Sequence, residues 1–256
     1  MNALPELKGL FKGPVLIFAS GPSALDVPLD VLNKINILTV NGAVQTLLRM
    51  NVKPLVYVFN DGYFVENNID LIKSAIDNCK YVLMPKTFHQ MYFSSYEGNI
   101  FYINRVNRDG RRLPDRVFSL SKILDKELVC SFSLLSKNKN RIGFSKDINK
   151  GYFCGRTIPY LALQVAYYLG FNTVFFAGLD LNGALGRFYD TGSTGLETTL
   201  DNDYEKYILP SFLKYKKNIE SKNFKAYNLS EYSRLDSGVV NKVDVNFLKL
   251  ACEKVE

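Results

Sequence analysis

The chain has 256 residues, and 47% of them are hydrophobic, which is enough for a substantial core and excludes a largely disordered protein. This length suits one large α/β domain, or one domain with a small subdomain. The formal net charge of +7 favours an anionic partner such as a phosphorylated glycan, a membrane surface or a nucleic acid.

Short apolar runs alternate with amphipathic stretches along the chain, which is the pattern of an α/β fold with a mostly parallel sheet and helices on both faces. The predicted strands are Pro14–Ala19, Ile35–Val40, Leu55–Phe59, Tyr81–Met84, Ile100–Ile103, Thr173–Ala177 and Phe224–Leu229. The predicted helices include Ile69–Ile76, Leu120–Leu135, Tyr204–Ser221 and Asn246–Lys254. We expect residues 1–256 to form a single domain.

The first three predicted strands each end in a small polar cluster. These clusters are Ser20–Ser23, Asn41-Gly42 and Asn60-Asp61. Parallel strands share one edge for their carboxyl ends, and open α/β sheets bind ligands there. A Gly-Pro-Ser turn also exposes backbone N–H groups that can hold an anion, although an ordinary turn explains that motif equally well. Together, the clusters predict a nucleotide-binding crevice.

The segment from Gly151 to Asp180 reads as a loop, a helix, a turn and a buried strand. Thr157 is the expected N-cap, and Gly170 lies where the helix should stop. The strand that follows ends in Gly178-Leu-Asp180, a fourth polar cluster for the same edge. The start of the helix, Gly155-Arg156-Thr157, offers N–H groups, a hydroxyl and a guanidinium, which suit a phosphate or a carboxylate.

An arginine-rich segment, Asn104–Arg116, carries five arginines in thirteen residues and is broken by glycine and proline, so a loop is expected. It is either a solvated basic loop or a clamp for an anionic acceptor or anionic lipid headgroups. The arginines form one cluster without an RNA-binding motif or interleaved aromatics, so nucleic acid is not the expected partner.

Polar, glycine-containing chain follows Asp180, and residues 182–221 are predicted to act as a lid over the crevice. Asp201-Asn-Asp203 has the spacing of a metal-dependent nucleotide-sugar site, but such residues are also common in turns. The sequence contains no GxGxxG after the first strand, no P-loop and no GxSxG. The single histidine, His89, lies beside aromatics and is read as structural, or as a weak candidate base.

Four cysteines lie far apart without metal-ligand spacing, so we read them as thiols in a reducing compartment. The first residues, Met1–Lys12, lack the apolar core of a signal peptide. No run approaches the roughly 18 apolar residues of a membrane span. A cytoplasmic protein, held at a membrane surface, is therefore expected.

Several of these segments resemble bacterial CMP-sialyltransferases, and more closely the transferases that add a side residue of 3-deoxy-manno-octulosonic acid (Kdo) to the inner core of lipopolysaccharide. The resemblance spans roughly residues 14 to 232, and its motifs are specific together rather than singly. The segments most alike are Lys53–Phe59, Gly143–Ile148, Thr157–Tyr167, Gly178–Leu181 and Arg187–Asp190.

The resemblance implies a Rossmann-like glycosyltransferase that takes a CMP-linked 2-keto acid sugar, here CMP-Kdo, and uses neither metal nor cofactor. It implies a lipopolysaccharide or lipid A-core acceptor and a peripheral position at the inner face of the inner membrane. The implied donor-binding residues are Gly21, Pro22, Ser23, Asn41, Asn60, Gly155, Arg156, Thr157, Gly178, Asp180 and Tyr189. The implied acceptor-binding residues are Arg105, Arg108, Arg111 and Arg112.

The sequence departs from the sialyltransferase pattern at two points. Ser20 stands where those enzymes have asparagine before Gly-Pro-Ser, and no histidine follows Asp180 to serve as the lid base. If the base lies in these segments, a carboxylate must accept the proton of the acceptor hydroxyl in place of the missing histidine. The candidate catalytic residues are Asp61, Asp190, Asp203 and Glu205, with Asp201 as a further candidate base. We expect inversion at the anomeric carbon.

Two alternatives remain open from the sequence. The donor can be CMP-sialic acid or another nonulosonate rather than CMP-Kdo, since donor choice alone separates these enzymes. The chain can also be a non-catalytic module that binds nucleotide or anionic glycan on a degenerate transferase fold, because the lid histidine is missing.

Overall fold

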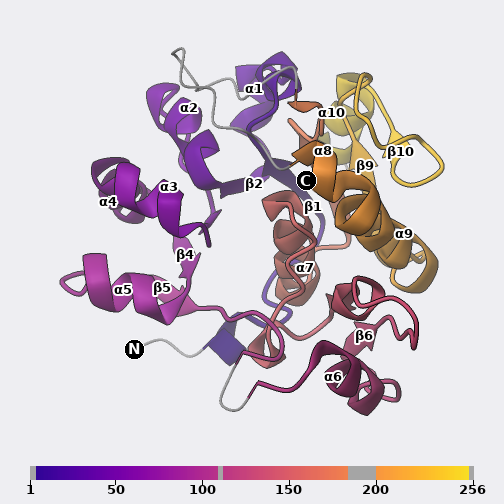
Figure 1. Ribbon diagram of the computed structural model, residues 1–256. Coiled ribbons are helices and arrows are strands. Elements are labelled where there is room, and N and C mark those ends of the chain that lie inside the picture. The colour runs from indigo at the N-terminus through magenta and orange to yellow at the C-terminus, as the bar shows by residue number, and fades with distance from the viewer. Residues whose placement is uncertain (1–3, 109–111, 184–199, 254–256) are drawn as a thin grey trace.

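The computed structural model describes residues 4–108, 112–183 and 200–253. Within them, eight strands form one sheet in the order β10-β9-β8-β1-β2-β3-β4-β5 (Figure 1). Every neighbouring pair in that sheet is parallel. The fold is therefore the predicted α/β architecture with a mostly parallel sheet.

The strands of this sheet lie close to their predicted positions. They are β1 Pro14–Phe18, β2 Asn36–Val40, β3 Val56–Val58, β4 Tyr81–Met84, β5 Ile100–Tyr102, β8 Thr173–Ala177, β9 Lys225–Asn228 and β10 Asn241–Lys242. The sequence analysis missed β10, a two-residue edge strand with too few residues to show a periodic pattern.

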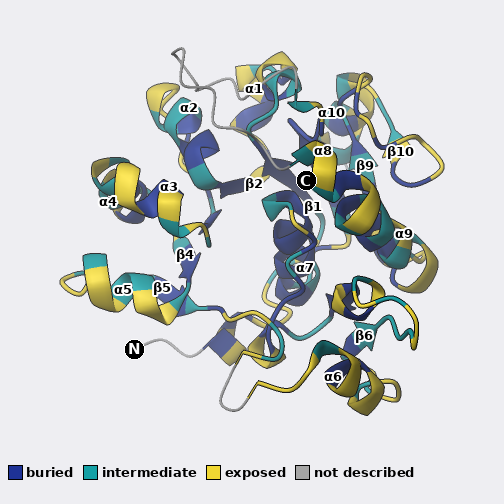
Figure 2. Ribbon diagram, viewed as in Figure 1, coloured by how far each residue is buried: buried dark blue, intermediate teal, exposed yellow. Residues whose placement is uncertain are grey.

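Both faces of the sheet are covered, because alternate residues of each strand point to opposite sides. In β1, Val15 and Ile17 pack into one cluster with residues of helices α7, Ile158–Leu169, and α9, Leu209–Asn218. Leu16 and Phe18 of the same strand pack on the other side. Figure 2 shows the central strands of the sheet in the colour of buried residues. The helices on that side are α1 Leu29–Leu32, α2 Val44–Arg49, α3 Gly62–Asn67, α4 Ile69–Asn78, α5 Lys86–Tyr92 and α10 Val245–Glu253.

Helix α7 is the most deeply buried helix of the sheet layer. Its leucines and alanines are fully covered, and Pro159 occupies the first turn, where the missing N–H costs nothing. Gly170 ends it in the left-handed conformation, at φ 98°, as predicted. Thr157 holds the predicted N-cap position, although its side chain makes no capping hydrogen bond.

The segment predicted as a helix over Leu120–Leu135 is not one. Helix α6, Asp115–Ser121, ends early, and β6, Leu128–Cys130, pairs antiparallel with β7, Gly143–Ser145. Oδ1 of Asp125 accepts hydrogen bonds from the backbone N–H groups of Glu127 and Leu128, at 2.8 and 3.0 Å. This local turn competes with helix continuation and directs the chain into the hairpin.

The predicted lid region begins at residue 182, and its residues 184–199 lie outside the described part of the chain. The rest forms α8, Leu200–Asp203, a π-helical turn at Tyr204–Ile208, and α9. Phe212 and Tyr215 of α9 are fully buried against the sheet layer. Pro210 lies at the start of α9, where the prediction placed an interruption inside one longer helix.

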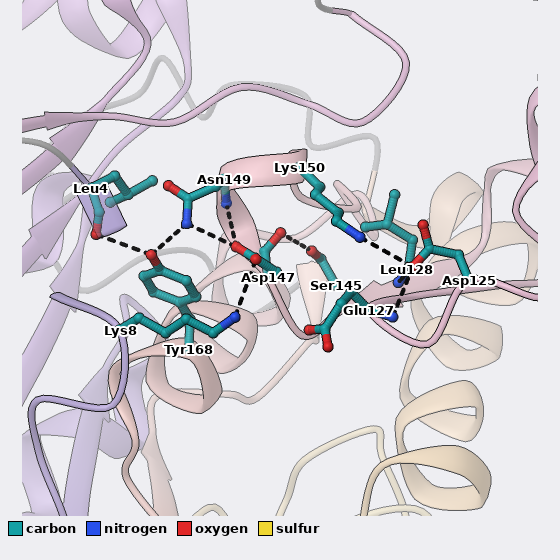
Figure 3. A network of polar contacts seen from close by, with 10 residues as sticks. All are labelled: Leu4, Lys8, Asp125, Glu127, Leu128, Ser145, Asp147, Asn149, Lys150 and Tyr168. Carbon is teal, nitrogen blue, oxygen red and sulfur yellow. Dashed lines mark hydrogen bonds and ion pairs between the residues drawn. The ribbon is translucent and has the colours of Figure 1, made fainter. Parts of the chain in front are cut away.

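A polar network ties the beginning of the chain to the end of α7 (Figure 3). The Tyr168 hydroxyl donates to the Leu4 carbonyl at 3.0 Å, and Lys8 contacts Asp147 at 3.2 Å. Partial burial opposes the charge of Asp147, but hydrogen bonds from Asn149 and the nearby Lys8 outweigh it, so the pKa of this carboxyl is lowered. The network lies apart from the segments predicted to bind a ligand, so its role is to hold the fold.

No helix among the described residues has the length and apolar character needed to cross a membrane.

Candidate functional site

The order in which successive strands are added to the sheet reverses once, between β1 and β8. From β1 the strands proceed outward through β2, β3, β4 and β5, and β8, β9 and β10 are then added on the other side of β1. Open parallel sheets bind ligands beyond the carboxyl ends of the strands at such a reversal. The predicted clusters Ser20–Ser23 and Gly178–Asp180 follow these two strands directly, so they meet there.

Gly21 and Gly178 are required because two backbone segments cross at this point. The Gly21 N–H donates to the Gly178 carbonyl at 3.0 Å. Gly178 has φ 77°, and a Cβ there would lie 2.7 Å from the Ala19 carbonyl oxygen. A Cβ on Gly21 would lie 2.5 Å from a carboxylate oxygen of Asp180. The structure therefore gives both glycines a role in chain crossing, and the contact with the donor that the resemblance implied stays a prediction.

Asp180 holds the Gly-Pro-Ser turn in place from its buried position at 4% exposure. Its carboxylate accepts hydrogen bonds from the Ser23 N–H, at 3.1 Å, and from the Ser23 hydroxyl. The same hydroxyl oxygen accepts from the Gly178 N–H at 3.2 Å. The carboxylate of Asp180 therefore fixes the shape of this turn.

Asn41 follows β2, the neighbour of β1 on the other side. Its backbone has φ 41°, a left-handed conformation that few side chains adopt and that asparagine tolerates best. Its Oδ1 atom is buried and has no hydrogen-bond partner within the described residues. A buried polar atom without a partner costs free energy, and such atoms are concentrated at functional sites.

Asn60 and Asp61 follow β3, two strands away from β1. The Asn60 side-chain amide donates to the Tyr152 hydroxyl at 3.0 Å. Oδ1 of Asp61 caps helix α3 by accepting from the N–H groups of Tyr63 and Phe64, at 3.0 and 3.4 Å. Its other oxygen, Oδ2, takes no part in the cap, and the residue is exposed at the sheet edge.

Arg105 brings a positive charge to the same place. Just beyond β5, its backbone pairs with Tyr152 in an isolated parallel bridge. Partial desolvation lowers the pKa of Arg105, but the neighbouring Cys154 and Tyr152 outweigh it, so the net shift is upward. The nearby charge of Asp61 adds to this effect. Arg105 was predicted to bind the acceptor, and the structure places it just beyond β5 at the same edge of the sheet, within reach of the charge of Asp61.

The loop before α7 presents a second guanidinium. Arg156 has φ 58°, its Nε lies 4.0 Å from a carboxylate oxygen of Asp203, and its guanidinium stacks over the Tyr207 ring at 5.3 Å. Gly155 precedes it, and a Cβ there would lie 2.5 Å from the Tyr160 ring. The two contacts of Arg156 link the start of α7 to the turn at Tyr204–Ile208.

Arg234 is a residue that the sequence analysis missed. Its N–H donates to the Asp180 carbonyl at 2.9 Å, and its guanidinium lies over the Tyr204 ring at 3.8 Å. The same guanidinium contacts Asp201 at 2.7 Å and Glu205 at 3.8 Å. Arg234 lies six residues after the end of β9, so the rule that polar clusters directly follow their strands does not single it out.

The candidate catalytic carboxylates therefore differ in their surroundings. Asp203 is paired with Arg156, and Glu205 with Arg234. Asp190 and Tyr189 lie outside the described residues. Asp61 keeps one oxygen out of its helix cap. Of the described candidates, Asp61 lies just after β3 on the predicted sheet edge with one carboxylate oxygen outside its cap, so its position favours it as the base.

Two of the remaining predicted acceptor arginines, Arg108 and Arg112, lie in a segment whose ends, Asn107 and Leu113, are joined by hydrogen bonds. The Asn107 amide donates to the Leu113 carbonyl at 2.7 Å, and Oδ1 of Asn107 accepts from the Leu113 N–H at 2.9 Å. Arg108 and Arg112 are exposed on this loop, and Arg111 lies outside the described residues. A pocket of about 430 Å³ borders the loop and includes Lys122 and Lys150 in its lining.

Three comparisons place this chain among known proteins. Residues 8–246 match a family model described as "3-deoxy-D-manno-octulosonic acid transferase WaaZ". A probable 3-deoxy-manno-octulosonic acid transferase of Escherichia coli K12 is 31% identical over 234 residues, covering 88% of this chain and 81% of the relative. A protein of the same description from Salmonella typhimurium is 30% identical over 252 residues, covering 91% and 88%.

A solved structure, that of the MAf glycosyltransferase from Magnetospirillum magneticum AMB-1, shares the fold with a TM-score of 0.53 at 12% identity. The match covers 94% of this chain and 36% of the longer protein. At this identity, the likeness supports the fold alone.

Proposed function

Because the chain belongs to the WaaZ family of 3-deoxy-D-manno-octulosonic acid transferases, we propose that it transfers Kdo from CMP-Kdo to the inner core of lipopolysaccharide without a metal ion. The single observation that carries this proposal is the convergence of Ser20–Ser23, Asn41, Asn60-Asp61 and Gly178–Asp180 along one sheet edge at the chain reversal. Ligands of open parallel sheets bind at this place.

The donor nucleotide would bind across the ends of β1 and β2. The Gly-Pro-Ser turn is held rigid by Asp180, and Asn41 aims a buried amide oxygen that has no protein partner within the described residues. Such an oxygen can accept a hydrogen bond from a cytosine amino group or a ribose hydroxyl. Arg156 and Arg105 would supply the positive charge that a phosphate and a sugar carboxylate need, which supports a reaction without metal.

In the proposed reaction, an acceptor hydroxyl oxygen forms a bond to the anomeric carbon of Kdo as the bond from that carbon to the phosphate oxygen breaks. CMP leaves with the electron pair, and Asp61 accepts the hydroxyl proton. Arg105 beside Asp61 would orient the sugar carboxylate and stabilise the negative charge on the departing group. Attack opposite the leaving group inverts the anomeric carbon.

The acceptor side would be the arginine-rich loop, where Arg108 and Arg112 are exposed. The inner core carries phosphates and acidic sugars, which guanidinium groups bind well. The acceptor is anchored in a membrane, so the enzyme would work at the cytoplasmic face of the inner membrane as a peripheral protein, attracted by anionic lipid to its net positive charge.

A panel of donors tests the proposal. The protein is incubated with CMP-Kdo, CMP-sialic acid or a UDP-sugar, together with a truncated lipopolysaccharide acceptor, with and without EDTA. We expect transfer from CMP-Kdo alone, at the same rate in EDTA, and a product of inverted anomeric configuration by NMR. Transfer from CMP-sialic acid instead would select the alternative donor. Binding of CMP without transfer from any donor would select the non-catalytic module.

Replacing Arg234 tests whether this residue positions the candidate site or only stabilises the folded protein. Arg234→Ala removes the guanidinium that joins Tyr204, Asp201 and Glu205 beside Asp180, so the site loosens, and we expect kcat/KM to fall about ten- to hundredfold. Lys8→Ala is the matched control, because Lys8 also contacts a carboxylate, that of Asp147 at 3.2 Å, and lies over an aromatic ring, that of Tyr168. It should lower Tm by a comparable amount and leave kcat/KM within about twofold. Equal kinetic losses in the two variants would contradict this role.

A further inference from the structure

Helix α6 presents an apolar face to solvent. Val117 and Leu120 lie three residues apart on α6 and so share one face of the helix, and Leu113 and Leu124 flank the helix at its two ends. All four are exposed, with Leu124 at 90%. The opposite side of the helix is already used, because Phe118 and Ser119 are buried against the body of the protein. The exposed face therefore has no partner within the described residues.

A second pair of leucines extends this face. Leu134 and Leu135 are 66% and 98% exposed in the loop that follows β6. This loop packs on α6, since the Arg116 guanidinium donates to the Leu134 carbonyl at 2.5 Å and the Ser119 hydroxyl donates to the Asn140 carbonyl at 2.7 Å. The two segments thus form one continuous surface, the α6 patch, at the lower right of Figure 1.

The α6 patch gathers much of the exposed apolar surface of the protein. Among the described residues, 7 of the 17 large hydrophobic side chains that are exposed lie between residues 113 and 135. The members are Leu113, Val117, Leu120, Ile123, Leu124, Leu134 and Leu135. Single exposed leucines are common on protein surfaces, but a contiguous group indicates an interaction surface.

Positive charge surrounds the patch. Residues 112–141 contain seven lysines and arginines against three acidic side chains, a net charge of +4. Arg112, Arg116, Lys137 and Lys139 are exposed. Leucines at the centre of a basic rim are the pattern of surfaces that lie in the headgroup region of anionic bilayers, where the apolar groups insert and the cations meet phosphates.

We propose that the α6 patch is the surface by which this protein docks on an anionic lipid bilayer. The charge favours an anionic bilayer over a second copy of this chain, because the second copy would bring the same net positive charge to the interface. The inference rests on the proposed function in one respect, namely that an enzyme with a lipid-anchored acceptor needs such a surface.

The fold connects this surface to the candidate site. Arg105 lies beside Asp61 at the sheet edge, and the loop that begins at Arg105 reaches the α6 patch at Leu113. The reciprocal Asn107–Leu113 hydrogen bonds shorten this connection. A bilayer bound at the patch would therefore hold a lipid-anchored glycan next to the arginine-rich loop.

Vesicle sedimentation tests the proposal. The full chain is mixed with vesicles of phosphatidylcholine alone, or of equal amounts of phosphatidylcholine and phosphatidylglycerol. We expect binding to the anionic vesicles at least about tenfold stronger than to the neutral ones. The double variant Leu124→Ser/Leu135→Ser should lose about tenfold of that binding or more, because two large apolar side chains no longer insert. Lys137→Glu/Lys139→Glu should lose a similar factor at low salt.

The matched control is Leu10→Ser/Leu250→Ser, which removes two leucines that are 52% and 57% exposed elsewhere and should bind as the unaltered protein does. Protection by CMP against thermal unfolding reports on the donor site, so it should be unchanged in all these variants. The proposal is overturned if the unaltered protein binds neither kind of vesicle or if Leu124→Ser/Leu135→Ser binds normally. It is also overturned if the unaltered protein binds no vesicles, forms a dimer by analytical ultracentrifugation, and loses that dimer in Leu124→Ser/Leu135→Ser.

Discussion

Replacing Asp61 by asparagine is expected to lower kcat by a factor of about 10² to 10⁴ while Tm stays within about one degree. Asparagine caps a helix as well as aspartate does, so the bonds from Tyr63 and Phe64 to Oδ1 can persist. What disappears is the ability to accept a proton. The measurement is steady-state transfer of Kdo together with a thermal melt, and the KM for the donor should change little.

Asp244→Asn is the control for this experiment. Asp244 is also an exposed helix-capping aspartate, since its Oδ1 accepts from the Phe247 N–H at 2.8 Å at the start of α10. The variant should match Asp61→Asn in stability and keep full activity. If Asp61→Asn retained normal kcat, the base would have to be another carboxylate, and Asp190, outside the described residues, would become the next candidate to replace.

Gly178→Ala is expected to cost about 3 kcal/mol of unfolding free energy and to abolish protection by CMP. A left-handed backbone costs an alanine about 1 kcal/mol, and the added Cβ would overlap the Ala19 carbonyl oxygen at 2.7 Å, which adds about 2 kcal/mol. For a chain of this size, the loss corresponds to a Tm lower by about 10 °C. The displaced crossing would also move the Gly-Pro-Ser turn away from the position that Asp180 gives it.

Gly9→Ala separates these two contributions. Gly9 has a comparable φ of 68°, but a Cβ there meets no atom within 4 Å. It should cost about 1 kcal/mol, the backbone contribution alone, and leave binding of CMP intact. Equal losses of stability in the two variants, measured by chemical denaturation, would show that the crossing of Gly21 and Gly178 tolerates a methyl group.

The positions and the parallel direction of the central strands could be predicted because the hydrophobic pattern is unambiguous. Runs such as Pro14–Phe18 and Thr173–Ala177 are apolar at almost every position, which indicates strands covered on both faces. The polar residues that follow these runs could be placed at one edge for the same reason. The hairpin β6–β7 could not be predicted, because its strands have three residues each and the turn at Asp125 outweighs the helical pattern around it.

The roles of the site residues were less accessible to sequence reasoning. Asp180 was assigned to the donor because of its position, but its carboxylate binds Ser23, which lies 157 positions away in the chain. Gly178 was assigned to a ligand contact, and the structure shows a crossing with Gly21. Arg234 was missed, although it donates to Asp180. These pairings depend on which residues, distant in the sequence, the folded chain brings within hydrogen-bonding distance of each other.

The sequence by itself determined the fold class and the edge of the sheet at which the polar clusters gather, because these follow from local periodicity and from the rule that parallel strands share an edge. The family followed from the resemblance of its motifs to known transferases. Only the tertiary structure decided which polar groups are already bound to one another and which, such as Asn41, keep an atom without a protein partner within the described residues. It also decided that the apolar face of α6 is left uncovered. The reason is physical: hydrogen-bond pairing and burial act over distances of a few ångströms in space, whatever the separation along the chain.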